Sequence, residues 1–340
     1  MLPKNPLERI AEVMEQNYLV TYALAEYLNH NPRLLSSDMV ESFAKECDLG
    51  IDDAYQVLFC AACGFDTAEN RLHRLLEREY FVRGLHALEP KEFTENPYHK
   101  TIKIKPMKLG RWELRESHYA PFEPFVCGHP QVTKEFREIP QIGYFKEQFS
   151  FPAVLENGIE WMTITPNEIE TMKEPIRKAN GNVLTLGLGL GYYAFMVSEK
   201  EDVTSVTVVE KDESVISLFR DIILPQFPHA EKVKIVNADA FDYLENTVKD
   251  GQFDYLFADL WHDQSDGLPL YLRLRKLEKS LPHTTFSYWI EPTILTSLRH
   301  MVFDKITDPN ASIRLADISP NELLSDEFLK KLAVDIKKIE

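Results

Sequence analysis

Three glycines in the second half of the chain lie where a strand is expected to turn into a helix. Gly187, Gly189 and Gly191 belong to the run Asn182-Val-Leu-Thr-Leu-Gly-Leu-Gly-Leu-Gly-Tyr-Tyr-Ala194, in which an apolar β-prone segment precedes a helix-compatible one. Glycine at such a turn permits positive φ and lets a ligand approach the backbone. The helix that follows directs free N–H groups toward the same place. The turn therefore predicts a nucleotide-binding site, and the alternative is a structural turn that binds nothing.

The spacing of these glycines disfavours two familiar nucleotide sites. The pattern is G-x-G-x-G followed by Tyr192, Tyr193 and Ala194, so the dinucleotide form G-x-G-x-x-G is not met. The Gly-Lys-Ser/Thr ending of a phosphate loop is also missing, which disfavours hydrolysis of ATP or GTP. The identity of the nucleotide therefore depends on the residues that follow.

Acidic residues stand at the ends of the next three expected strands. The three segments are rich in β-branched and aromatic residues, which favours buried strands. They are Val203–Glu210, which ends on Glu210, Val233–Asn237, which Asp239 follows, and Phe253–Ala258, which Asp259 follows. In a doubly wound sheet, ligands bind along the carboxyl ends of the strands, and an acid after the second strand reaches ribose hydroxyls. The pattern predicts an α/β, Rossmann-like fold, with a fifth strand at Thr284–Ile290.

This order of glycines and acids resembles the class I S-adenosylmethionine-dependent methyltransferases, in particular the branch that includes the spermidine synthases. The resembling part runs from about Phe151 to Ile306. The resemblance implies that the glycine turn faces the methionine part of the cofactor, that Glu210 holds the ribose hydroxyls, and that Asp239 with Ala240 borders the adenine. It also implies that Asp259 lies beside the sulfonium and the incoming nucleophile. The residues expected to contact the cofactor are Gly187, Leu188, Gly189, Gly191, Tyr192, Glu210, Lys211, Asp239, Ala240 and Asp259.

The chain departs from the pattern of these families at three places. Thr185 stands two residues before the first glycine, where many methyltransferases carry an acid that spermidine synthases tend to lack. The Asp-Ser-Ser-Asp-Pro segment typical of spermidine synthases is here Asp259-Leu-Trp-His-Asp-Gln-Ser-Asp266, and only the first acid matches. The segment Leu155–Glu168 resembles the hairpin and helix start of that branch, with Trp161 or Met162 near the place of its glutamine. The donor is accordingly either S-adenosylmethionine or its decarboxylated form.

Two side chains after the fourth strand are candidates for catalysis. Transfer of a methyl or aminopropyl group from a sulfonium is an in-line displacement, and catalysis lies mainly in positioning and desolvating the nucleophile. A base is needed only for a protonated amine or a hydroxyl, and Asp259 is the stronger candidate for that role. His262 is the weaker candidate. Histidine is the side chain most often used as a base near neutral pH, but a solvated loop histidine is the alternative. Trp261 is expected either to face the sulfonium through cation–π attraction or to pack in the core.

The composition is that of an ordinary globular protein. The 340 residues are 44% hydrophobic and 27% charged, and the formal net charge is −16. This acidity disfavours a nucleic-acid surface and suits a small-molecule substrate such as a cationic amine, although solubility alone also explains it. No apolar stretch reaches the about 20 residues of a membrane helix, and residues 1–8 lack an export signal pattern. We therefore expect a cytoplasmic protein without a membrane partner.

The length exceeds that of a usual single domain and favours two domains, and the pattern along the chain divides the residues into three segments. We expect a helical bundle at residues 1–90 and the Rossmann-like domain at residues 166–340. Between them, we expect residues 91–165 to form a β-containing subdomain or lid, with a proline-rich connector as the alternative. Cys60 and Cys63 have C-x-x-C spacing without a second pair or histidine cluster, so we expect helix packing and no metal. The segments expected to be regular are helices at Leu7–Leu28, Ser36 or Ser37 to Gly50, Ile51–Gly64, Thr67 (as cap) to Gly84, Leu268–Glu278, Ile294–Phe303 and Glu322–Glu340, and strands at Thr101–Lys105 and Trp112–Arg115.

The sequence thus predicts an S-adenosylmethionine-dependent methyltransferase with a small-molecule acceptor. Three alternatives remain: an aminopropyltransferase that uses decarboxylated S-adenosylmethionine, a non-catalytic protein that binds an adenosyl ligand, and an NAD-dependent oxidoreductase. The sequence leaves open the acceptor atom, the role of residues 1–90 and whether the chain forms a homo-oligomer.

Overall fold

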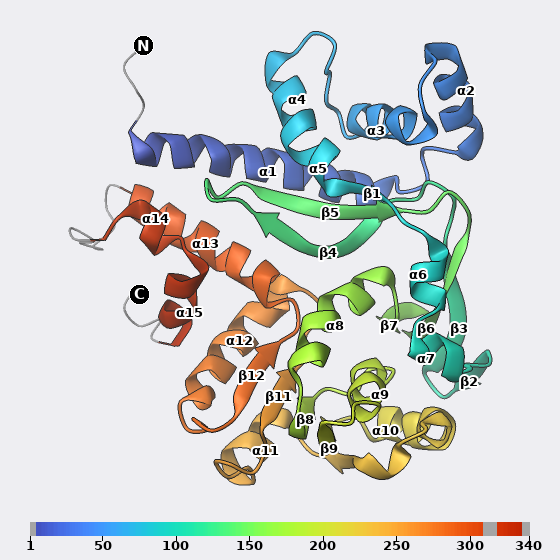
Figure 1. The fold of residues 1–340 in the computed structure, drawn as a ribbon, viewed down its shortest axis with the longest axis vertical. Coiled ribbons are helices and arrows are strands. Elements are labelled where there is room, and N and C mark those ends of the chain that lie inside the picture. Colours follow the sequence, from blue (N-terminus) through green and yellow to red (C-terminus); the bar gives the residue numbers. More distant parts are fainter. Residues whose placement is uncertain (1–4, 309–317, 335–340) are drawn as a thin grey trace. The chain divides into compact units, whose positions relative to one another are not determined.

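The computed structural model describes residues 5–308 and 318–334, and the chain forms two compact units. The first unit contains Met1–Thr94, Glu116–Pro152 and Thr165–Glu168. The second contains Glu95–Arg115, Ala153–Ile164 and Ile169–Glu340. Neither unit is a continuous segment, because the chain passes between them several times (Figure 1).

The first unit begins with the helices that the sequence pattern predicts. Asn5 caps the first of them and Ser36 the second. The expected cap at Thr67 is wrong. The Asp66 carboxylate accepts the N–H groups of Ala68 and Glu69 and so closes a turn. The helix begins only after Asn70, which caps it. The helices are α1 (Pro6–His30), α2 (Ser37–Cys47), α3 (Ile51–Ala62), α4 (Arg71–Leu76), α5 (Val82–Gly84) and α6 (Pro90–Thr94), with a π-helical segment at Glu77–Phe81.

A three-stranded sheet completes the core of the first unit. The strands β1 (Leu85–Ala87), β4 (Phe125–Val132) and β5 (Glu138–Tyr144) lie in the order β1-β5-β4, with β1 parallel and β4 antiparallel to β5. The buried core that they share with the helices includes Tyr55, Phe59 and Cys60. Burial raises the pKa of the Cys60 thiol to about 12. The expected packing role of this cysteine in a helix is therefore confirmed.

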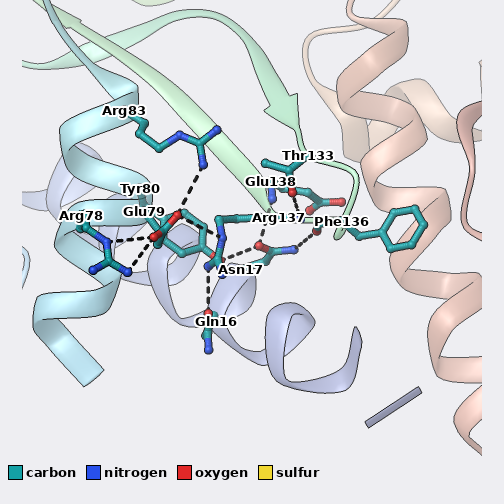
Figure 2. A network of polar contacts seen from close by, with 10 residues as sticks. All are labelled: Gln16, Asn17, Arg78, Glu79, Tyr80, Arg83, Thr133, Phe136, Arg137 and Glu138. Atoms are coloured by element: carbon teal, nitrogen blue, oxygen red, sulfur yellow. Dashed lines mark hydrogen bonds and ion pairs between the residues drawn. The ribbon is translucent and has the colours of Figure 1, made fainter. Parts of the chain in front are cut away.

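A buried asparagine joins α1 to the hairpin between β4 and β5 (Figure 2). The side-chain amide of Asn17, which is 1% exposed, donates to the carbonyl of Phe136 at 2.8 Å. Its oxygen accepts the hydroxyl of Tyr80 at 2.7 Å and the N–H of Glu138 at 3.0 Å. An unpaired buried amide would cost about 1–3 kcal/mol. The paired amide therefore fixes the tip of the hairpin on the helix.

A second sheet has the order β2-β3-β6-β7 and follows α7 (Pro97–Thr101) in the chain. Its strands are β2 (Met107–Leu109), β3 (Trp112–Tyr119), β6 (Phe149–Glu156) and β7 (Ile159–Thr163). The expected strand at Trp112 is confirmed, and the one at Thr101–Lys105 is wrong. Thr101 ends α7, the N–H of Ile102 bonds the carbonyl of Tyr98 at 2.7 Å, and the side chain of Ile102 is buried. Pro106 then offers no N–H to a ladder.

The second unit is built on a five-stranded parallel sheet with the order β10-β9-β8-β11-β12. The chain runs outward from β8 to β10, returns, and then runs outward through β11 and β12. The direction therefore switches between β8 and β11, as in doubly wound sheets. This arrangement confirms the Rossmann-like fold. The strands are β8 (Gly181–Leu186), β9 (Val203–Glu210), β10 (Val233–Asn237), β11 (Tyr255–Ala258) and β12 (Thr285–Tyr288).

Helices connect these strands. They are α8 (Pro166–Lys178), α9 (Tyr192–Ser198), α10 (Glu213–Leu218) continued by a π-helical segment at Phe219–Ile223, α11 (Ala240–Asn246), α12 (Gln264–Glu278) and α13 (Glu291–Thr307). Two short 3-10 turns, Leu224–Gln226 and Ala230–Lys232, precede β10.

The last described segments form two short helices against α12 and α13 (Figure 1). They are α14 (Pro320–Leu323) and α15 (Asp326–Val334), so the single helix expected from Glu322 is wrong over its first part, and residues 335–340 lie outside the described residues. Arg299 is 1% exposed and its Nε donates to the carbonyl of Leu324 at 3.0 Å, which holds α14 and α15 on α13. Among the helices of residues 5–308 and 318–334, we find none with the length and apolar character needed to cross a membrane.

Candidate active site

The glycine turn after β8 has the backbone shape that only glycine adopts easily. The φ angles of Gly187, Gly189 and Gly191 are +94°, +53° and +74°. A Cβ on Gly187 would lie 2.0 Å from the carbonyl oxygen of Asp259, and one on Gly191 would lie 2.2 Å from the ring of Phe219. A Cβ on Gly189 would meet nothing nearer than the sulfur of Met162, at 3.6 Å. Gly187 and Gly191 therefore allow close packing, whereas a Cβ on Gly189 would make only an ordinary contact with Met162.

Glu210 ends β9 and is tied to the glycine turn. Its Oε2 accepts the N–H of Leu188 at 3.3 Å, and its Oε1 accepts the N–H of Asp212 at 2.8 Å. The side chain is half-buried. A carboxylate has about four lone-pair sites, so two main-chain bonds leave room for further donors. The structure thus brings the expected ribose acid to the glycine turn and fixes its direction.

Asp259 follows β11, the strand next to β8. Its N–H donates to the carbonyl of Leu186 at 2.9 Å, which sets it beside the start of the glycine turn. Within the described part of the chain, no hydrogen bond reaches its half-buried carboxylate. Burial, with a smaller contribution from the negative charge of Glu210, raises the pKa of Asp259 to about 7. A carboxyl group with this pKa can accept a proton at neutral pH.

Asp239 and Ala240 begin α11 beyond β10. The Asp239 carboxylate is exposed and caps the helix, accepting the N–H groups of Phe241 at 2.9 Å and Asp242 at 3.1 Å. Ala240 is buried in the first turn. Both residues therefore lie at the same carboxyl edge of the sheet as Glu210, with the Asp239 side chain already bonded to its own helix.

Asn237 connects the end of β10 to the loop that carries Glu210. Its side-chain amide donates to the carbonyl of Glu210 at 3.2 Å and to the carbonyl of Lys211 at 3.0 Å. The side chain of Lys211 is exposed. Asn237 was not among the sequence candidates, and its position at a strand end is the signal that points to it.

The exposed ring of His262, in the loop after β11, is paired with Asp266 and packs against Trp161. Its ring Nδ1 lies 3.2 Å from the Asp266 carboxylate, and its main-chain N–H donates to the same carboxylate. The exposed imidazole stands edge-on to Trp161, with ring centroids 4.7 Å apart. Asp263 caps α12 and accepts the N–H of Ser265 at 2.6 Å. Among the described residues no hydrogen bond joins His262 to Asp259, which leaves Asp259 as the unpaired acid of this loop.

The aromatic residues around the site mostly pack in the core. Trp261 is 5% exposed and lies on Gly267, where a Cβ would come within 2.8 Å of its ring, so the packing alternative is the observed one. The hydroxyl of Tyr192 accepts the amide of Asn96 at 2.9 Å. Tyr193 stacks on Phe257, with ring centroids 4.1 Å apart. By contrast, Trp161 is 39% exposed. Within the described ranges, no group of three or more His, Cys, Asp and Glu side chains could hold a metal ion.

Substitution of the glycines separates packing from ligand binding. Gly191→Ala should lower the free energy of unfolding by about 2–4 kcal/mol, because its Cβ meets Phe219 and its φ is positive. Gly189→Ala should cost only about 1–2 kcal/mol of backbone strain, yet weaken adenosyl-ligand binding by at least about tenfold. Denaturant unfolding and calorimetric titration measure the two effects. Full ligand affinity in a folded Gly189→Ala protein would mean that no ligand lies over this turn.

Residues 167–275 match the model of the spermine/spermidine synthase domain family. Similar solved structures include a spermidine synthase from Thermotoga maritima (16% identity, TM-score 0.32, covering 45% of this chain and 59% of that one). Another is a spermidine synthase in complex with the transition state analogue AdoDATO (16%, 0.30, 42% and 52%). A third is a putative O-methyltransferase from Klebsiella pneumoniae (20%, 0.24, 29% and 43%).

The chain thus spans between two fifths and three fifths of the length of these three solved proteins. A comparison with curated protein sequences finds no match. The domain match covers β8, β9, β10 and β11, four of the five strands of the parallel sheet. Residues 167–275 therefore combine a match to the spermine/spermidine synthase domain model with the strand order of a Rossmann-like sheet.

Proposed function

We propose that the chain transfers a methyl group from S-adenosylmethionine to a small-molecule acceptor. The observation that carries the proposal is the meeting of three strand ends at one edge of the parallel sheet. The glycine turn after β8 bonds Glu210 of β9 through the N–H of Leu188 and abuts the main chain of Asp259 after β11. An adenosyl donor suits this edge, because the glycine turn has no side chains at Gly187, Gly189 and Gly191 to keep a ligand from the backbone, and Glu210 keeps free lone pairs for the ribose hydroxyls.

The residues of the chain divide the work of the reaction. When bound, the donor supplies a methyl carbon on a sulfonium: the acceptor lone pair forms the new bond while the carbon–sulfur bond breaks and its electron pair stays on sulfur. Glu210 and the glycine turn orient the donor, and this positioning is the main source of rate in such a displacement. Asp259 takes the proton from the acceptor, and its pKa of about 7 suits that role at neutral pH.

The acids of the loop after β11 favour methyl transfer over aminopropyl transfer. Asp263 caps α12 and Asp266 holds His262, so both are committed to the loop itself. Asp259 is then the one acid of this loop that is available to an acceptor amine. A polyamine acceptor carries several cationic groups and would need more than one such acid. The overall charge of −16 remains suited to an acceptor with a single amine.

Aminopropyl transfer from decarboxylated S-adenosylmethionine is the second candidate. The domain match over residues 167–275 favours it. Thr185 also favours it, because this buried threonine stands where many methyltransferases carry an acid; its hydroxyl lies 3.4 Å from the carbonyl oxygen of Gly187.

Donor preference distinguishes these candidates. We expect calorimetric titration to show binding of S-adenosylmethionine and S-adenosylhomocysteine, with the decarboxylated form at least about tenfold weaker. Methyl transfer from a labelled donor to a panel of amines and hydroxyl compounds should then be detected by mass spectrometry. Preference for the decarboxylated donor would select the aminopropyltransferase, and binding without transfer would select a non-catalytic protein. Binding of NAD in place of every adenosylmethionine derivative would overturn both proposals.

A further inference from the structure

Arg111 bonds two acids that are distant from it in the sequence. The arginine lies in the turn between β2 and β3, within the second unit. Its Nε lies 3.0 Å from the Glu156 carboxylate on β6, and its Nη2 donates to the carboxylate of Asp212. Its own carbonyl accepts the N–H of Asn157 at 2.8 Å. The guanidinium also lies over the ring of Trp112, 5.1 Å from its centroid. Arg111 is therefore held from several sides, although its side chain is 48% exposed.

Asp212 links this arginine to the candidate ribose acid. Its N–H donates to Glu210 Oε1 at 2.8 Å, and its Oδ1 caps α10 by accepting the N–H of Ser214 at 2.8 Å. The indole N–H of Trp112 donates to the Ser214 hydroxyl at 3.0 Å. Arg111 and Trp112 therefore both bond the segment that joins β9 to α10, Arg111 through Asp212 and Trp112 through Ser214.

The charge of Asp212 fits a fixed ion pair. Burial alone would raise its pKa, but the bonds from Ser214, the first-turn N–H groups and the charge of Arg111 together lower the pKa below its usual value. Asp212 is therefore ionised at neutral pH while it receives Arg111 on one oxygen and the helix N–H groups on the other.

We propose that Arg111 is a positioning residue for Glu210, and through it for the ribose of the adenosyl ligand. The proposal rests on the proposed function for the identity of that ligand. Both oxygens of Glu210 are directed by main-chain N–H groups, one from Leu188 and one from Asp212. Arg111 fixes the loop that supplies the second N–H. Its removal should leave the fold and the proposed general base Asp259 in place and free the direction of the Glu210 carboxylate.

An exposed ion pair contributes little to overall stability, so the effect of Arg111 should be local. We expect Arg111→Gln to weaken S-adenosylhomocysteine binding roughly tenfold in calorimetric titration, within the range of coupling between contacting residues. The melting temperature should stay near that of the wild type. Arg111→Lys, which keeps the charge toward Asp212, should recover part of the affinity. Lys108→Gln is the matched control, because it removes the neighbouring 2.9 Å pair with Glu113 on the same hairpin.

A double-mutant cycle tests whether Arg111 acts through Glu210. In a Glu210→Gln background, Arg111→Gln should cause no further loss of affinity, because the group it positions is already disabled. Additive losses would overturn the proposal, as would wild-type affinity in Arg111→Gln or an equal loss in Lys108→Gln.

Amide hydrogen exchange provides a readout that needs no ligand. The N–H groups of Leu188 and Asp212, which donate to Glu210, should exchange faster in Arg111→Gln than in the wild type or in Lys108→Gln. If the wild type binds no adenosyl ligand, the proposed function fails, but faster exchange at these two amides still supports the positioning role. Unchanged exchange at both amides overturns the positioning role whether or not the ligand binds.

Discussion

The Asp259→Asn variant is expected to lose between about a hundredfold and ten-thousandfold in kcat, the usual contribution of a general base. The amide keeps the size of the carboxyl group but cannot accept a proton from the acceptor. Donor affinity should remain within a few fold of the wild type, because Glu210 and the glycine turn hold the donor. Asp242→Asn is the matched control, since Asp242 is an exposed acid in the first turn of α11. Undiminished transfer by Asp259→Asn would remove Asp259 from the mechanism.

The Asp259→Asn substitution should also change how the transfer rate depends on pH. The pKa of Asp259 is raised to about 7 in the folded state, chiefly by burial. A base acts when it is deprotonated, so the wild-type rate should rise with pH and level off above about 7. The residual rate of Asp259→Asn should lack this titration. A wild-type profile that is flat between pH 6 and 8 would contradict the assignment.

The stability of this variant relative to the wild type should also depend on pH. The folded state binds the Asp259 proton more tightly than the unfolded chain does, because the ordinary pKa of this carboxyl group is 3.8 and the pKa in the folded state is about 7. Stability from this group is therefore complete below pH about 4 and is lost as the pH rises toward 7. Asp259→Asn should unfold at a higher denaturant concentration than the wild type at pH 8, and at the same one at pH 4. A variant that is less stable at pH 8 would contradict the raised pKa.

Glu210→Ala is expected to lose about 1–3 kcal/mol of binding free energy for S-adenosylhomocysteine, because it leaves the ribose hydroxyls without a charged acceptor. This corresponds to between about fivefold and 150-fold in Kd. Calorimetric titration measures the loss directly. Glu213→Gln is the matched control, since this exposed acid lies three residues along the chain in the first turn of α10. Equal affinities of Glu210→Ala and the wild type would place the ribose elsewhere.

The carboxyl edge of the parallel sheet could be predicted from the sequence because its information is local. Val203–Glu210 and Val233–Asn237 are strands over the full predicted ranges. Each is a short run of β-branched residues between breakers, so its ends are visible in the chain. The acids then follow from the rule that parallel strands share one edge. The glycine turn and Glu210 meet there, through the N–H of Leu188, because their strands are neighbours.

The remaining features of the fold and of the site depend on contacting residues that no local sequence pattern identifies. Ile102 alternates with polar neighbours like a strand residue, yet it packs beside α7 because Pro106 interrupts any ladder. Asn70 replaces Thr67 as a cap because Asp66 closes a turn first. Arg111 reads as an isolated surface arginine, and its link to Asp212 spans 101 positions. Only the folded hairpin brings that charge to the loop of the ribose acid.

A crystal structure of the protein with S-adenosylhomocysteine tests the central claim most directly. We predict electron density for one ligand molecule at the carboxyl ends of β8, β9 and β11, with the ribose hydroxyls bonded to Glu210, the chain between them over Gly189, and the sulfur beside Asp259. Ligand density at any other part of the chain, or a protein that crystallises without the ligand at concentrations far above millimolar, would contradict it.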